Sequence, residues 1–442
     1  MVIKTDRAKK IMRKTAMILF WLLLWQLVSL AVGNYVLMVG PWETLLRFLF
    51  LLGETQFYVT VGMSLLRIGA GFLTGFLAGV FLAACSSRFR LLEEGLAPVM
   101  SLLKAIPVAS FVVLLLIWWG SSFLAVAVCF LVVLPNIYIN TLEGVKSTDS
   151  ALLEMGKVFR LPFGTKIFYI YLPALRPFLT GGLKLALGMC WKSGVAAEVI
   201  GTPAHSVGGQ LYLSKIYLDT AGVFAWTAAV ILLSVLFERL ILLGVERIFT
   251  WQPACSAPAD VPGTPVAVVL KGVEKSFKLP EGTGYQQVIS CLSAVYEPGR
   301  IYYLSSPSGS GKTTLLRILA GLTEADGGEL TVPGTVSMVF QEDRLCMDCS
   351  ALKNVEMVTG DAAWAEEALG MLLEPEDLEK TCTSLSGGMK RRVALVRAME
   401  ARSQLVLLDE PFTGMDAETK ERAEKYIRTR QQGRTLIIAT HI

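Results

Sequence analysis

Long apolar runs before residue 251 constrain the fold of this chain more than any other feature. Six stretches are long enough, at about 20 mostly apolar residues each, to cross the hydrocarbon core of a lipid bilayer. They are Thr15–Val36, Val59–Cys85, Ala97–Trp119, Ser122–Asn140, Pro177–Ile200 and Val223–Val245. Of the 442 residues 53% are hydrophobic, and this excess lies almost entirely in the first half. The sequence therefore predicts a six-span α-helical membrane domain over residues 1–250.

The basic residues predict the orientation of these spans. The N-terminus, the segment that holds Arg88 and Arg90, and the segment between residues 146 and 176 are basic and fall on one side of the membrane. The positive-inside rule makes that side cytoplasmic, and six crossings return the chain to it. We expect an uncleaved first helix and a multi-pass protein of the cytoplasmic membrane, with its C-terminal half in the cytoplasm.

Charged and small residues inside the spans have separate interpretations. Gly71, Gly75 and Gly79 recur every four residues, a spacing that lets a second helix approach closely. Charge at membrane depth usually faces a bundle interior or a water-filled path. Lys192 and Glu198 are therefore candidates for a substrate path, and the alternative for Lys192 is a structural pairing.

After the membrane half the sequence pattern changes. Residues 251–265 are rich in proline and small residues and read as a linker. Residues 266–442 alternate short β-rich runs with helices, which indicates an α/β domain. The overall prediction is a multi-domain chain, with an α-helical membrane domain followed by an α/β domain.

The stretch "YLSSPSGSGKTTLLRILAG" carries the nucleotide-binding prediction, although Ser306 stands where the first glycine of G-x-x-x-x-G-K-[ST] belongs. The strand "RIYYL" precedes the loop and the helix "TTLLRILAGL" follows it, as a P-loop requires. Backbone amides would surround the β-phosphate, Lys312 would reach the β- and γ-phosphates, and the Thr313 hydroxyl would bind Mg²⁺. The expected ATP-binding residues here are Ser308, Gly309, Ser310, Gly311, Lys312, Thr313 and Thr314.

Further candidate residues follow in order along the chain. In "LVLLDE", Asp409 is placed to hold Mg²⁺ and Glu410 to activate the attacking water. Gln341 would sense the γ-phosphate and the metal, and His441 would contact the γ-phosphate. Phe277 resembles an aromatic residue that stacks on adenine, with simple packing as the alternative.

The stretch "SLSGGMKRR" resembles the signature of ATP-binding cassette (ABC) proteins, apart from Met389 in place of glutamine. That resemblance implies that Ser386, Gly387 and Gly388 close over ATP held by another subunit. Asp416 matches a loop that crosses the same interface, and a helical subdomain is expected at about residues 342–395. The implied assembly is a homodimer, or a pair with a related half-transporter.

The segment "LLEMGKVFRLPFGTKIFYIYLP", between the fourth and fifth spans, is too polar to span and too apolar for a free loop. It resembles the E-A-A-x3-G-x9-I-x-L-P motif in the permeases of bacterial binding-protein-dependent importers. Glu154 keeps the acidic position, while Gly156 and Arg160 replace an alanine and the glycine. The resemblance implies a cytoplasmic coupling helix that docks in a groove of the ATPase. The stretches "RIGAGFLTGFLAGV", "KAIPVASFVVLLLIWWG" and "CWKSGVAAEVIG" are similar to permeases of the nitrate, sulfonate, taurine and pyrimidine-precursor group, and the resemblance covers nearly all of the first 250 residues.

These observations predict an ATP hydrolase that imports a small anionic or polar organic solute delivered by a separate extracytoplasmic solute-binding protein. An ABC exporter and a nucleotide-gated membrane regulator without transport are the alternatives. The short membrane half and the coupling motif favour import over export.

The net charge of +4 is small and spread over both halves, so no nucleic-acid partner is expected. Cys346 and Cys349 have no second pair to complete a zinc site.

Overall fold

The computed structural model describes residues 2–256, 266–279, 284–307 and 309–440. It divides into two compact units. The first comprises Met1–Lys146 and Leu175–Ile248, and the second comprises Ser147–Ala174 and Phe249–Ile442. The segment that carries the expected coupling helix therefore folds with the α/β half of the chain. Part of the expected linker, residues 257–265, lies outside the described residues.

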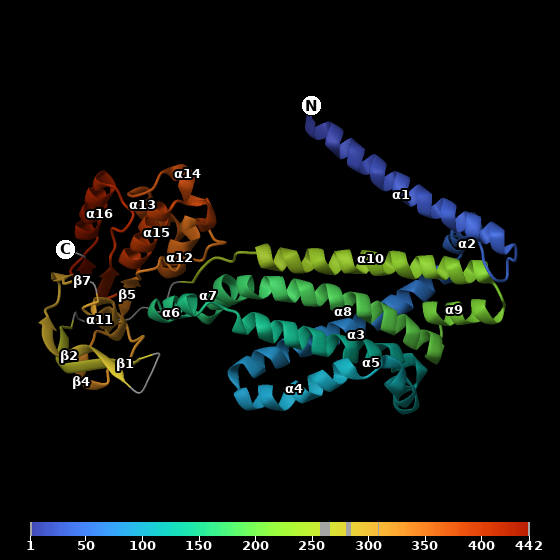
Figure 1. Cartoon of the computed structure of the whole chain (residues 1–442), viewed down its shortest axis with the longest axis horizontal. Coiled ribbons are helices and arrows are strands. Elements are labelled where there is room, and N and C mark those ends of the chain that lie inside the picture. Colours follow the sequence, from blue (N-terminus) through green and yellow to red (C-terminus); the bar gives the residue numbers. More distant parts are fainter. Residues whose placement is uncertain (1, 257–265, 280–283, 308, 441–442) are drawn as a thin grey trace. The chain divides into compact units, whose positions relative to one another are not determined.

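The first unit is helical (Figure 1). Its elements are α1 (Val2–Val32), α2 (Pro41–Leu52), α3 (Thr55–Arg88), α4 (Arg90–Ala105), α5 (Val108–Lys146), α8 (Leu172–Gly201), α9 (Val207–Ile216) and α10 (Thr220–Thr250). Within the described residues, four helices are long and apolar enough to cross a membrane: Met12–Val32, Thr55–Arg88, Val108–Lys146 and Thr220–Thr250. The membrane-type helical domain is thus present, whereas the count of six crossings remains a prediction.

The structure corrects the third and fourth expected spans. The expected continuous helix Ala97–Trp119 is wrong, because α4 ends at Ala105 and α5 begins at Val108. Pro107 has no amide hydrogen and disfavours helical geometry at Ile106, whose φ and ψ are −70° and 125°. The expected gap after Trp119 is instead a kink inside α5 at Gly120, with φ 72° and ψ 174°.

The glycines of α3 form the contact with α5. A Cβ atom added to Gly71 would lie 2.5 Å from the carbonyl oxygen of Val126 and 2.6 Å from Cβ of Cys129. At Gly75 and Gly79 an added Cβ would lie 3.0 Å from atoms of α5. This is the close helix approach that the spacing of the glycines predicts.

The second unit contains two sheets. Strands β1 (Val268–Lys278), β2 (Tyr285–Tyr296) and β4 (Gly327–Thr331) form an antiparallel sheet in the order β2-β1-β4. Strands β3 (Ile301–Ser305), β7 (Thr435–Thr440), β6 (Leu405–Asp409) and β5 (Val336–Val339) form a parallel sheet in the order β3-β7-β6-β5. Strand β6 is buried throughout, as a continuous apolar run in a parallel sheet requires.

Helices surround these sheets and bring the candidate residues to one edge. They are α11 (Lys312–Leu319), α12 (Ala351–Thr359), α13 (Ala362–Gly370), α14 (Pro375–Leu378), α15 (Gly387–Glu400) and α16 (Ala417–Thr429). The segment before α8 adds α6 (Ser150–Val158), α7 (Phe163–Lys166) and a π-helical turn (Ile167–Tyr171). Because β3 and β6 are parallel to β7 on either side of it, their carboxyl ends share an edge, where ligands bind in such sheets.

We expect Gly71→Ala to destabilise the helical unit, because the new methyl group overlaps Val126 and Cys129. Overpacking of this kind costs about 1–3 kcal/mol. Gly62→Ala in the same helix is the matched control, since an added Cβ there meets nothing within 4 Å. Thermal unfolding of the detergent-purified protein measures both; equal midpoints for the two variants would contradict the proposed contact.

Candidate functional site

The loop between β3 and α11 has the backbone of a phosphate-binding loop. Gly309 and Gly311 adopt φ values of 81° and 85°, which a glycine tolerates without strain. Ser306 is not among the described residues with positive φ, and its Oγ lies 2.7 Å from Oγ of Ser310. Ser306 therefore occupies a position that does not require glycine. Ser308 lies outside the described residues.

Lys312 and Asp409 form the charged centre of the site. The Lys312 ammonium donates to the carbonyl oxygens of Ser306 and Pro307, the latter at 3.1 Å. Asp409 ends β6, is 1% exposed, and its Oδ2 has no hydrogen-bond partner among the described residues. Burial raises the pKa of Asp409, while a hydrogen bond with the Thr313 side chain lowers it. A buried carboxylate with a free oxygen beside a threonine hydroxyl fits the hard oxygen ligands of Mg²⁺.

A cavity of about 410 Å³ brings most of the candidate nucleotide-binding residues together. Those that line it are Phe277, Gly309, Ser310, Gly311, Lys312, Thr313, Thr314, Gln341 and Glu410. The Glu410 backbone has φ 50°, a left-handed conformation that is strained for a residue with a Cβ. His441 lies outside the described residues.

The signature residues do not line this cavity. Ser386 caps α15, where its Oγ accepts a hydrogen bond from the backbone amide of Met389 at 3.3 Å. An added Cβ on Gly388 would lie 2.7 Å from the carbonyl oxygen of Gly414. Asp416 similarly caps α16 by accepting from the amide of Thr419 at 2.8 Å. The sequence prediction of an amide-rich helix start at Gly387 and Gly388 agrees with this geometry, and a second subunit stays a prediction.

Glu154 of α6 joins two parts of the α/β unit. Arg317 Nη1 and Nη2 donate to its two carboxylate oxygens at 3.0 and 2.8 Å, and Arg344 Nη1 donates to Oε2 at 2.6 Å. Hydrogen bonds from Arg317 and then Arg344 lower the pKa of Glu154. Arg317 lies in α11, which begins at Lys312, and Arg344 follows Gln341 by three residues. The carboxylate therefore contacts both segments that lead to the cavity.

The other two motif positions also have a structural explanation. Gly156 is buried, and an added Cβ would lie 3.2 Å from Cδ1 of Ile170. Arg160 has φ 51°, so it keeps the left-handed backbone for which glycine is favoured. Its guanidinium donates to the carbonyl oxygen of Gly334.

In the helical unit, Glu198 is fully buried while Lys192 is exposed. Glu198 Oε2 accepts from Ser64 Oγ at 2.7 Å and from the Gly208 amide at 3.1 Å, and its Oε1 lies 3.6 Å from Arg67 Nη1. Glu198 thus fastens α3, α8 and α9 together, and its burial gives no support to contact with a solute. Lys192 has no ion-pair partner within the described residues.

Sequence reasoning missed Arg317, Arg344 and Arg67. Arg317 and Arg344 lie 163 and 190 residues after Glu154, so no local pattern connects them. The signal in the sequence was Glu154, an acidic residue in the expected coupling helix that needs basic partners. Arg317 follows the P-loop and Arg344 follows Gln341, so both were candidates.

Family models match both halves of the chain. The family described as "Binding-protein-dependent transport system inner membrane component" matches residues 75–249, and the family described as "ABC transporter" matches residues 290–413. The two matches leave a gap that contains the expected linker.

Similar proteins include ATP-binding proteins named for the import of aliphatic sulfonates. One from Pseudomonas syringae pv. syringae is 44% identical over 163 residues, covering 36% of this chain and 57% of that protein. One from Rhodococcus jostii is 40% identical, with coverage of 38% and 62%. One from Rhizobium johnstonii is 34% identical, with coverage of 47% and 78%. The chain spans about three fifths of the length of the first two.

We expect Ser306→Gly to change nucleotide affinity only modestly, because Ser306 needs no positive φ. Lys312→Ala should weaken nucleotide binding, because it removes the ammonium from the cavity. A charge-assisted contact typically contributes about 1.5–3 kcal/mol. Equilibrium binding of a fluorescent ATP analogue to the purified chain compares the two. A large gain in affinity for Ser306→Gly would show that the natural loop is defective.

Proposed function

The chain belongs to the ATP-binding cassette transporter family, and on that premise we propose that it uses ATP to import a small anionic or polar organic solute. The observation that carries the proposal is the contact of Glu154 with Arg317 and Arg344. Glu154 lies in the segment between α5 and α8, and its contacts join that segment to the two segments that lead to the nucleotide cavity. A separate extracytoplasmic solute-binding protein would deliver the solute to the cytoplasmic membrane.

The cavity residues suit ATP binding and hydrolysis. Lys312 would hold the β- and γ-phosphates, with the loop amides from Ser308 to Thr314 around them. Thr313, Gln341 and Asp409 would hold Mg²⁺, which when bound neutralises charge on the phosphates. Glu410 would orient and activate the attacking water, and His441 would contact the γ-phosphate. Phe277, which is 44% exposed at the cavity, offers its ring to the adenine.

A second subunit completes the site in this proposal. Ser386, Gly387, Gly388 and Asp416 lie outside the cavity of their own chain, and the start of α15 presents backbone amides that suit a phosphate. The partner is a second copy of this chain or a related half-transporter. Two such chains related by a two-fold axis would form two composite sites.

Nucleotide binding would reach the membrane helices through α6. Any movement of α11 or of the segment after Gln341 acts on Arg317 or Arg344, and both arginines hold the same carboxylate. Nucleotide can shift the transporter between two conformational states only if it binds those states with unequal affinity. Closure of the ATPase would turn the membrane helices outward, and hydrolysis would reset them.

Lys192 favours an anionic solute. A free ammonium inside a membrane helix is costly against lipid, so it is expected to face a water-filled path or a second subunit. Among the relatives, several are named for aliphatic sulfonates and one from Rhizobium meliloti for Fe³⁺ ions. Because the solutes in those names differ, the proposal of an anionic solute rests on Lys192.

We expect Glu154→Gln to uncouple transport from hydrolysis, because it weakens two charge-assisted contacts. Reconstituted with its binding protein, the wild type should accumulate solute and show solute-stimulated ATPase activity, whereas Glu154→Gln should retain basal hydrolysis. Glu366→Gln, at an exposed position of α13, is the matched control. Absence of both accumulation and stimulation in the wild type would favour a nucleotide-gated regulator, and efflux would favour an exporter.

Lys192→Met is expected to lower transport of an anionic solute, while Lys192→Arg should retain most of it. The ammonium contributes about 1.5–3 kcal/mol if it contacts the anion directly, which corresponds to roughly tenfold or more in affinity. Solute uptake at varied concentration measures the change, with basal ATPase activity as the folding control. Unchanged uptake by Lys192→Met would remove the argument for an anion.

A further inference from the structure

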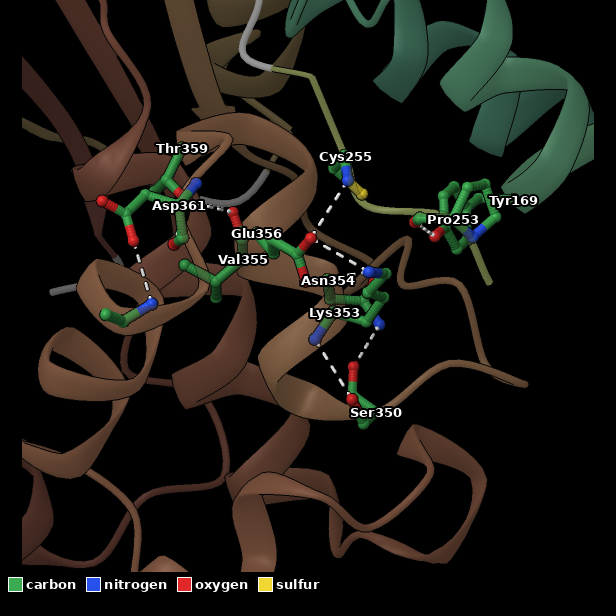
Figure 2. A network of polar contacts seen from close by, with 11 residues as sticks. Tyr169, Pro253, Cys255, Ser350, Lys353, Asn354, Val355, Glu356, Thr359 and Asp361 are labelled. Carbon is green, nitrogen blue, oxygen red and sulfur yellow. Dashed lines mark hydrogen bonds and ion pairs between the residues drawn. The ribbon is translucent and has the colours of Figure 1, made fainter. Parts of the chain in front are cut away.

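The linker residues that directly follow α10 are bound to other parts of the second unit. Pro253 contacts Tyr169 of the π-helical turn that follows α7, and Cys255 contacts Glu356 of α12 (Figure 2). We call the contacting residues Tyr169, Pro253, Cys255, Lys353 and Glu356 the linker clamp. All five belong to the second compact unit.

Tyr169 forms one side of the clamp. It belongs to residues 147–174, the segment that carries the expected coupling helix and is called the coupling segment below. Its hydroxyl donates to the carbonyl oxygen of Pro253, and the residue is 3% exposed. Burial raises the pKa of Tyr169, so the phenol remains a hydrogen-bond donor at neutral pH. Beside this bond, Phe168 and Trp251 meet edge to face with ring centroids 5.3 Å apart. The coupling segment is therefore bonded to the start of the linker.

Glu356 forms the side that comes from the ATPase. Its Oε1 accepts a hydrogen bond from the backbone amide of Cys255 at 3.0 Å. Lys353 Nζ lies 3.0 and 2.9 Å from its two carboxylate oxygens, and the same ammonium lies 5.7 Å from the ring centroid of Tyr169. Glu356 and Cys255 are each 7% exposed. A buried carboxylate needs such donors, and the linker backbone supplies one of them.

Hydrogen bonds at the start of α12 hold the ATPase side of the clamp. Ser350 caps α12 by accepting from the amide of Lys353 at 3.1 Å, and Asn354 Nδ2 donates to the Ser350 carbonyl oxygen at 3.0 Å (Figure 2). Helix α12 packs against α15, which begins at the signature glycines. Movement of α15 would therefore be passed to the clamp.

We propose that the linker clamp fixes which ATPase each permease engages. The coupling segment, residues 147–174, and the start of the linker at residues 251–255 both contact the ATPase of the same chain. Glu356 acts as a positioning residue that seats the linker, and Tyr169 bonds the linker to the coupling segment. In a dimer, each permease would then be driven by its own ATPase. The consequence for transport rests on the proposed function, whereas the pairing itself does not.

A cross-linking experiment on co-expressed copies tests the pairing. Both copies retain Cys255 and Cys346, which belong to one buried cluster, as their only cysteines, keep Glu356, and have a protease site within residues 257–265. One copy has an N-terminal tag and the other a C-terminal tag of equal mass. A short thiol-to-thiol reagent followed by cleavage should give products that each carry one tag. Products with both tags or none would overturn the proposal, as would failure to cross-link; Cys255→Ser is the reagent control.

Coupling measurements test the positioning roles in the full chain. Glu356→Gln and Tyr169→Phe should lower solute stimulation of the ATPase by about tenfold, the typical factor for losing one charge-assisted or buried hydrogen bond, with basal hydrolysis unchanged. Tyr285→Phe, at a tyrosine that is 72% exposed, should leave stimulation unchanged. Full stimulation in both clamp variants would refute the positioning role. A wild type without any stimulation would instead count against the proposed function.

Discussion

The functional arrangement depends on one carboxylate held by two arginines. Glu154 accepts three hydrogen bonds at 2.6–3.0 Å from Arg317 and Arg344. Arg317 lies in α11, which begins at Lys312, and Arg344 follows Gln341; both Lys312 and Gln341 line the nucleotide cavity. Bidentate contacts between arginine and carboxylate are directional as well as strong. The side chains are partly shielded from solvent, which limits screening of the charges. Helix α6 is therefore placed by the same elements that would respond to nucleotide.

Two departures from familiar motifs are explained by the backbone. Arg160 replaces a glycine but keeps a left-handed conformation, and its guanidinium gains a contact with the Gly334 carbonyl oxygen. Ser306 replaces a glycine in a conformation that needs none, and its hydroxyl bonds to Ser310. A residue that departs from a motif is thus judged by the φ it adopts and the partners it gains.

The charged residues on α8 and their partners fall into two groups. Arg67 and Glu198 are buried together, and Arg67 also donates to the backbone carbonyl oxygens of Ala204 and His205. Their opposite charges offset each other, which a low-dielectric environment requires. Lys184 and Lys192 are exposed on α8 and have no ion-pair partners within the described residues. The charge left available to a solute or a second subunit on this helix is therefore positive.

The two-part organisation of the chain can be read from the sequence alone, because apolar run length and strand-loop-helix patterning are local properties. The sequence also predicts that Lys312, Thr313 and Asp409 belong to a nucleotide site, since each residue lies at or beside the end of a helix or strand. Pro107 is a local helix-breaking signal that the prediction of a continuous span overlooked. The burial of Glu198 and the partners of Glu154 are visible only in the tertiary structure. Those outcomes depend on contacts between residues far apart in the chain, and neither periodicity nor spacing records which distant side chains meet.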